Sequence, residues 1–400
     1  MIDRQSAGIL PPKPHTVCRD AAGNLLYEEM FTRGGFAGAF SYFYHRWPVT
    51  PHREVASSDR GYRPPAASVL GNGRAPHPLR RRLYASDRVK EGGQMIDCRV
   101  PILFNAQLTI LLARPTETDD AYFANGDGDE LWFVHEGDAA LESPCGWLDV
   151  KAGDYVWIPK AMIHRWHVRG KSMRLMCFES QGHKGIFVPD QFRNPVGQLR
   201  MDAPYTHRDF VRPVGPIATP DHLPDGPLEL LVKKGGIYTR YETERPPMDV
   251  LGWDGFVYPF AFAIEKYQPK VGLVHLPPTI HTTFEGDGFL VCSFVPRPTD
   301  FHPQAIPCPY PHSSVDCDEV ILYLRGNFTS RRGVGPGAIS LHPAGIAHGP
   351  HPGAYEASIG SVRTDELAVM IDTYLPLVPT AQAAGLEDVG YHDSWRTTST

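Results

Sequence analysis

Two histidines and one glutamate in the last hundred residues have the types and spacing of metal ligands. His312 lies seven residues before Glu319, and His348 follows in the same stretch of the chain. Two imidazoles and a carboxylate form the facial triad that binds non-haem Fe(II) and leaves the opposite side of the ion open. Substrate and O2 can both bind on an open side. We therefore predict that these three residues hold a metal and that oxygenase chemistry is what they would support.

Glu319 and His348 belong to a pattern that occurs twice. The template is Glu, six residues, Gly, a variable insert, Gly, five residues, Pro, one residue, Gly or Ala, two residues and His. Its fixed positions are Glu130, Gly137, Gly153, Pro159, Ala161 and His164 in the first copy, and Glu319, Gly326, Gly337, Pro343, Gly345 and His348 in the second. The offset between copies is 189 residues at the Glu and 184 at the His. A repeat at a nearly constant offset indicates a duplicated fold.

The first copy lacks one of the three ligand types. Residues 123–129 read FANGDGD and offer no His of the kind that precedes Glu319. Glu130 and His164 alone remain from the template. We predict that this half of the protein supports the fold and binds no metal.

The elements that must position these residues read as short strands. The chain has 38 Gly and 39 Pro among 400 residues, which disfavours long helices and suits strands joined by tight turns. Apolar or alternating runs of strand length occupy residues 131–135, 155–158, 173–178, 289–294, 320–324 and 367–374. The best helix candidate is Thr380–Glu387. In each copy a Glu on one strand and a His on another can point into one barrel.

These patterns predict an all-β dominated protein with two β-barrel domains and few short helices. The domains would be residues 1–212 and 236–400, joined by a Pro-rich linker at 213–235. The mouth of a small barrel is a natural site for a small molecule.

Composition excludes several other classes of function. The formal charge of −6 leaves no basic footprint for nucleic acid. No apolar run approaches the ~18 residues of a membrane span, and residues 1–15 contain no apolar core of a signal peptide. The seven Cys are odd in number and form no CxxC pair, which favours reduced thiols. We predict a cytoplasmic protein that binds neither nucleic acid nor membranes.

The duplicated template resembles the two sequence motifs of the cupin superfamily, and its double occurrence resembles a bicupin with two jelly-roll barrels. A more specific resemblance is to the homogentisate 1,2-dioxygenase family. It is carried by residues 340–350 (SLHPAGIAHGP) and 319–326 (EVILYLRG), and more weakly by residues 12–16 (PKPHT) and 44–46 (YHR). The resemblance covers nearly the whole chain and is strongest from Phe289 to Tyr374.

This resemblance implies an iron enzyme that cleaves an aromatic ring. His312, Glu319 and His348 would hold Fe(II), O2 would be the co-substrate, and both oxygen atoms would enter homogentisate or a related hydroquinone-type aromatic, as in tyrosine degradation. His342 would lie in the pocket or directly behind the ligands. A homo-oligomer, trimer or hexamer, is also implied.

The catalytic base implied by the resemblance is His275, in the run HLPPTI at residues 275–280, with His281 in reserve. A metal-bound imidazole normally donates its other nitrogen to an acceptor, so Asp316 or Asp318 is expected to orient His312.

Two departures from the family pattern affect the expected substrate. The spacing from His312 to Glu319 is one residue longer than the family's, and Phe328 stands where the family has a Tyr that holds the substrate carboxylate. Arg331 and Arg332 offer a replacement for that polar partner. Two alternatives stay open: a metal-dependent decarboxylase or isomerase, which would turn over without O2, and a non-catalytic bicupin that binds a small ligand.

Overall fold

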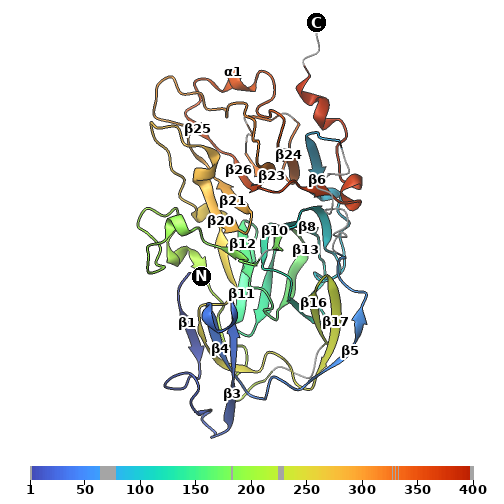
Figure 1. Cartoon of the computed structure of the whole chain (residues 1–400), viewed down its shortest axis with the longest axis vertical. Coiled ribbons are helices and arrows are strands. Elements are labelled where there is room, and N and C mark those ends of the chain that lie inside the picture. Colours follow the sequence, from blue (N-terminus) through green and yellow to red (C-terminus); the bar gives the residue numbers. More distant parts are fainter. Residues whose placement is uncertain are drawn as a thin grey trace.

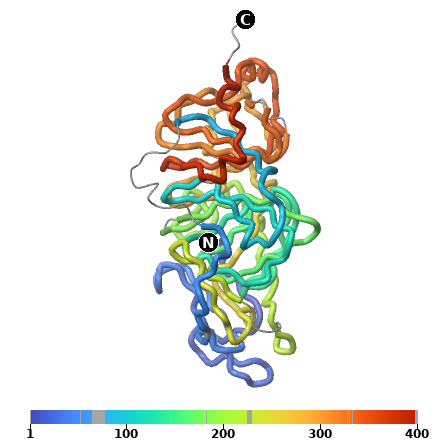
Figure 2. Tube along the Cα trace, turned by 90° about the vertical axis from the view of Figure 1, so that its right-hand side faces the viewer, coloured from blue at the N-terminus to red at the C-terminus, as the bar shows by residue number. Residues whose placement is uncertain are grey.

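The structure is a computed structural model that describes residues 2–63, 78–181, 183–223, 229–326, 328, 330–331 and 333–396. Strands dominate these ranges, and the two largest sheets form two jelly-roll barrels that lie end to end along the long axis (Figure 1). Figure 2 shows the same order from the side, with the second barrel at the top, the first in the middle and the N-terminal strands below.

The first barrel is a nine-stranded sheet. It consists of β7 (Val100–Phe104), β8 (Leu108–Ala113), β10 (Glu130–Ser143), β11 (Gly146–Lys151), β12 (Asp154–Ile158), β13 (Arg165–Ser180), β15 (Phe210–Val211), β19 (Phe260–Ala263) and β27 (Val378–Pro379). The second barrel is a seven-stranded sheet. It consists of β6 (Arg82–Ala85), β14 (Ile186–Phe187), β20 (Thr282–Gly286), β21 (Phe289–Phe294), β23 (Asp318–Arg325), β24 (Ala338–His342) and β26 (Leu367–Thr373).

Three smaller sheets complete the described strands. One contains β1 (Gln5–Gly8), β2 (Cys18–Arg19), β3 (Leu25–Thr32), β4 (Phe40–His45) and β18 (Val250–Gly255). Another contains β5 (His52–Ser58), β9 (Tyr122–Asn125), β16 (Glu229–Lys234) and β17 (Ile237–Thr243), and the last pairs β22 (Arg297–Pro298) with β25 (Arg363–Thr364).

Helices are short throughout the described ranges. The α-helix α1 spans Ala354–Ser358, and the 3-10 turns are η1 (Gly35–Ala37), η3 (Ser86–Arg88), η4 (Asp190–Phe192), η5 (His207–Asp209), η6 (Ile264–Lys266), η7 (Pro278–His281), η8 (Gln382–Gly385) and η9 (Tyr391–Trp395). None of them has the length and apolarity needed to cross a membrane.

The six predicted strand runs all fall on strands, and the predicted scarcity of helix is confirmed. The helix expected at Thr380–Glu387 is wrong in kind, because the structure has only the 3-10 turn η8 there. Gly385 ends that turn and a Gly disfavours continued helix. The helix α1 was not predicted.

Strands are exchanged between the N-terminal and C-terminal parts of the chain. β6 pairs with β24 of the second barrel, whereas β19 and β27 join the first barrel. Figure 1 shows β6 beside the strands of the second barrel. The division into residues 1–212 and 236–400 stays a prediction, and sheet pairing crosses it in both directions. Residues 224–228 of the expected linker lie outside the described residues.

The two barrels share one continuous apolar core. Tyr155 of the first barrel is fully buried and meets Phe284 of the second, with ring centroids 5.5 Å apart. The Tyr155 hydroxyl also lies 2.9 Å from Ser293 Oγ. Such interior contacts hold the second barrel, which carries the site, against the first.

Candidate metal centre

The three predicted ligands converge at one end of the second barrel. Glu319 is the second residue of β23, whereas His312 precedes this strand and His348 follows β24. The backbones of His312 and His348 pair as an isolated antiparallel bridge, with both N···O distances 2.8 Å. This bridge brings the two imidazole rings to 4.3 Å between centroids. Two backbone hydrogen bonds therefore fix the pair of rings opposite the strand that carries the carboxylate.

The spacing of the ligand atoms suits an ion between them. One ligand atom from each of the three residues lies within 4.8 Å of the others. Glu319 Oε2 is 4.0 Å from His312 Nε2 and 3.9 Å from His348 Nε2, too far for hydrogen bonds. An ion about 2 Å from each ligand atom spans such separations.

The histidine tautomers also fit a metal. His348 Nδ1 lies 3.3 Å from the Ile346 carbonyl and His312 Nδ1 lies 3.3 Å from the Tyr310 carbonyl. A nitrogen that donates to a carbonyl leaves the other nitrogen of the ring with a free lone pair. His348 Nε2 is buried and has no hydrogen-bond partner among the described residues. The orphaned nitrogen therefore points at the place where an ion would bind.

Electrostatics keep the carboxylate charged. Burial alone would raise the pKa of Glu319, but the hydrogen bond from His342 and the charge of Arg331 outweigh it and lower this pKa to about 2. Burial lowers the pKa of His348. A charged carboxylate and a neutral imidazole are the protonation states that metal binding requires.

The ligands open on a cavity of about 780 Å³, whose wall also includes His275, His281 and Arg331. His275 is exposed and its Nε2 lies 2.9 Å from the Tyr310 hydroxyl. His281 is buried, and burial together with the nearby Arg297 lowers its pKa to about 3. Both candidate bases thus face the same cavity as the ligands.

His342 lies behind the ligands and does not line the cavity. It is fully buried on β24, directly opposite Glu319 on β23. Its Nδ1–H donates to Glu319 Oε1 at 2.7 Å, and its Nε2 lies 3.3 Å from the Tyr391 hydroxyl. Burial lowers the pKa of His342 to about 4, so the ring is neutral at pH 7. Of the two places expected for it, the one behind the ligands is observed, and we describe it as a positioning residue.

The expectation that an aspartate orients His312 is wrong for Asp318. The two carboxylate oxygens of Asp318 accept hydrogen bonds from the backbone N–H groups of Ala344 and Leu377, each at 2.7 Å. Each oxygen of this carboxylate thus accepts one backbone hydrogen bond, and the two bonds brace the loops beside the site instead. His312 turns its Nδ1 to the Tyr310 carbonyl.

Sequence reasoning missed Asp372. It lies on β26 directly opposite Glu319 and lines the cavity. Burial and the charge of Glu319 raise the pKa of Asp372 to about 7. The signal that could have revealed it is an acid within the otherwise apolar run at residues 367–374.

Comparisons with known proteins relate the chain to dioxygenases. The family model described as "Homogentisate 1,2-dioxygenase N-terminal" matches residues 99–264. A Saccharolobus solfataricus protein named "Putative dioxygenase" is 36% identical over 400 residues, which cover 99% of this chain and 100% of the relative.

Two further comparisons are more distant. Homogentisate 1,2-dioxygenase of Bradyrhizobium diazoefficiens is 29% identical over 69% of this chain, and the match spans 63% of that enzyme's length. A solved cupin 2 conserved barrel domain protein of Leptotrichia buccalis has a TM-score of 0.34 and 10% identity, covering 75% of this chain and 97% of its own. The match along nearly the whole chain establishes that the protein belongs, as a divergent member, to the homogentisate 1,2-dioxygenase-like family of cupin dioxygenases.

Proposed function

We propose that the protein is an Fe(II)-dependent dioxygenase that cleaves the ring of homogentisate or a related hydroquinone-type aromatic. The observation that carries this proposal is the convergence of His312, Glu319 and His348 on a cavity of about 780 Å³. Three protein ligands leave coordination positions open for small molecules. When bound, Fe(II) would supply a path for electrons between the aromatic ring and O2.

The residues of this chain supply binding, orientation and proton transfer. His275 is our proposed base, which takes a phenolic proton from the substrate. Its Nε2 is 2.9 Å from the Tyr310 hydroxyl, and both side chains line the cavity. His281 is the weaker choice, because a pKa of about 3 makes its neutral ring a poor proton acceptor at pH 7.

Arg331 is our proposed partner for a carboxylate on the substrate. Phe328 makes one part of the cavity wall apolar, and the Arg331 side chain, 6% exposed, lies in the same wall. Its Nη1 donates to the Gly349 carbonyl at 2.6 Å, and its Nε is buried with no partner in the described part of the chain. Its Nη2 lies 3.9 Å from Glu319 Oε1, so Nε is the donor that remains for an anion, and a buried guanidinium with a free donor favours one. Arg332 lies outside the described residues.

One experiment tests the function. The purified protein is reconstituted with Fe(II) without oxygen, and O2 uptake is then followed with homogentisate, gentisate and hydroquinone. Uptake with one of these phenols, together with a ring-opened product, supports the proposal. Turnover without O2, supported by Mn or Zn, would point to a decarboxylase or isomerase. Weak metal binding and no O2 uptake would indicate a non-catalytic binding protein.

We also propose a homo-oligomeric assembly, trimer or hexamer. The mass of the purified protein in sedimentation velocity tests it, and a monomer at micromolar concentration would contradict it.

A further inference from the structure

The first barrel repeats the backbone geometry of the metal centre. Phe123 and His164 form an isolated antiparallel bridge with both N···O distances 2.9 Å, as His312 and His348 do in the second barrel. Phe123 also lies seven residues before Glu130, the spacing of His312 to Glu319. Phe123 is therefore the counterpart of the missing histidine.

The side chain of His164 is oriented like that of His348, its counterpart in the second barrel. Its Nδ1 lies 3.0 Å from the carbonyl of Met162, two residues earlier, as His348 Nδ1 faces the carbonyl of Ile346. Its Nε2 is buried and has no partner within the described ranges. Burial has the larger effect on the pKa of His164 and lowers it, although the charge of Glu130 raises it. Glu130 and His164 thus keep the template positions of Glu319 and His348, and Glu130 Oε2 accepts a hydrogen bond from Trp132 Nε1 at 2.7 Å.

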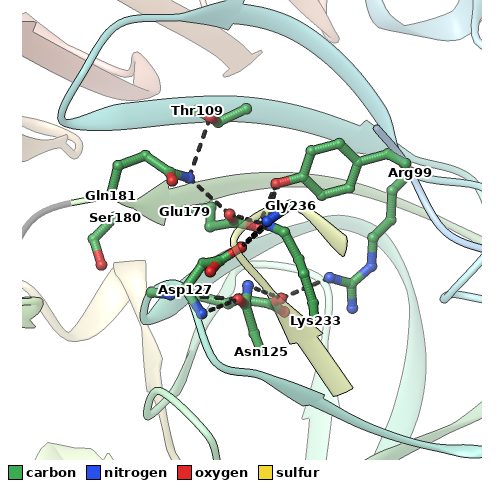
Figure 3. A network of polar contacts seen from close by, with 12 residues as sticks. Arg99, Thr109, Asn125, Asp127, Glu179, Ser180, Gln181, Lys233 and Gly236 are labelled. Carbon is green, nitrogen blue, oxygen red and sulfur yellow. Dashed lines mark hydrogen bonds and ion pairs between the residues drawn. The ribbon is translucent and has the colours of Figure 1, made fainter. Parts of the chain in front are cut away.

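A guanidinium fills the space beside them. Arg99 Nη1 donates to Glu130 Oε1 at 2.6 Å, and both side chains are 1% exposed. The Arg99 guanidinium carbon lies 4.5 Å from the centroid of the Phe123 ring, and its Nη2 is buried with no described partner. Figure 3 shows Arg99, Asn125 and Lys233 directed into one buried polar network. Asn125 Nδ2 also donates to Glu130 Oε1, at 2.8 Å.

These residues do not fit a metal ion as they stand. A divalent cation would meet the charge of Arg99 and an aromatic ring in place of one imidazole. The carboxylate of Glu130 still needs a positive partner, because a buried unpaired charge is strongly destabilising. Arginine supplies that charge at every physiological pH, since it does not deprotonate in proteins.

We infer that the Arg99 guanidinium takes the place of a metal ion in the first barrel, and that Glu130 and His164 form a latent divalent-metal site that Arg99 and Phe123 keep closed. The first barrel therefore keeps its charge balance without a metal supply. The inference concerns residues on the opposite barrel from the proposed iron centre, so it stands or falls separately from the proposed function.

The test restores the missing ligand and removes the cation. The double variant Arg99→Ala/Phe123→His is dialysed against Co(II), and metal bound per chain is compared with the wild type by elemental analysis. We expect one additional equivalent in the double variant and its loss when His164→Ala is added. Because the readout is a difference between variants, it does not depend on how much metal the second barrel holds. A folded double variant with no additional metal would overturn the inference.

A second set of variants covers the case in which the double variant does not fold. Arg99→Lys keeps a cation beside Glu130 and should unfold near the wild-type temperature, whereas Arg99→Met should unfold at a clearly lower temperature. Adding Glu130→Gln to Arg99→Met should recover much of the difference, because the unpaired charge is gone. A Met variant as stable as the wild type would show that no cation is needed and would refute the inference.

Discussion

The hydrogen bond from His342 to Glu319 allows a quantitative test of how the metal centre is supported. The bond is 2.7 Å long and fully buried, and its acceptor is a charged carboxylate. Hydrogen bonds to charged groups contribute ~1.5–3 kcal/mol. At about 1.4 kcal/mol per factor of ten, its loss should weaken metal binding roughly 10- to 150-fold. Residues that orient metal ligands typically contribute on the order of 10- to 100-fold, in agreement with this range.

Two substitutions separate the hydrogen bond from the volume of the ring. His342→Leu removes the donor and keeps an apolar side chain in the buried space. His342→Asn places an amide near the position of Nδ1, so it can still donate to Glu319. We expect the Leu variant to lose the full amount, roughly 10- to 150-fold in metal affinity, on the hydrogen-bond energies above. The Asn variant should bind metal within about threefold of the wild-type affinity.

The assay is competition for Co(II) against a chelator of known affinity, at pH 7.5. Tyr391→Phe is the matched control, since it removes only the 3.3 Å contact on the other ring nitrogen. Its affinity should match that of the wild type. If the Leu variant also binds Co(II) with wild-type affinity, His342 contributes only packing and does not position Glu319 for the metal.

Three further predictions concern single side chains. His348→Ala should abolish both iron binding and O2 uptake, and uptake that survives contradicts the ligand assignment. Arg331→Met should raise KM for substrates with a carboxylate by roughly 10- to 100-fold and leave KM for plain hydroquinone unchanged; an equal rise for both would exclude carboxylate recognition. Burial lowers the pKa of His164 to about 4, against ~6.5 in the unfolded chain. As pH falls from 6.5 to 4, the unfolded chain binds a proton that the folded chain does not, so the free energy of unfolding drops by up to about 1.4 kcal/mol per pH unit. In urea titrations, His164→Gln should make the free energy of unfolding less dependent on pH between 6.5 and 4, whereas substitution of the exposed His222 should not. The same pH dependence in His164→Gln and the wild type would show that His164 is not held neutral in the folded protein.

Local patterns predicted three candidate ligands in the second barrel, and the structure brings these three side chains together. The template supplies the fixed spacing of two of them, Glu319 and His348. Gly and Pro punctuate the strands, so a Glu at the start of one strand and a His after another reach the same point. The acceptor for His312 Nδ1 was not predicted, because it is the backbone carbonyl of Tyr310 and a carbonyl is common to every residue type.

Pairings between segments that lie far apart in the chain could not be predicted from the sequence. No sequence pattern near Arg99 predicts that its guanidinium pairs with Glu130, because a buried ion pair produces no periodicity in the sequence. An alternating pattern shows that a segment is a strand but not which strand it joins. The position of Phe123 could have been found, since it lies seven residues before Glu130, as His312 does before Glu319. It was missed because an aromatic side chain is not a metal ligand and did not suggest the comparison.

The pairing of β6 with β24 sets a waiting time during synthesis. Arg82–Ala85 leaves the ribosome long before Ala338–His342, its antiparallel partner. At ~5–20 residues per second, the intervening roughly 250 residues take about 13–50 s to translate. Throughout that interval the nascent chain carries an unpaired strand whose edge can join another polypeptide. A chaperone that shields this segment should therefore raise the yield of native enzyme, and any fragment meant to fold as the second barrel must bring residues 82–85 with it.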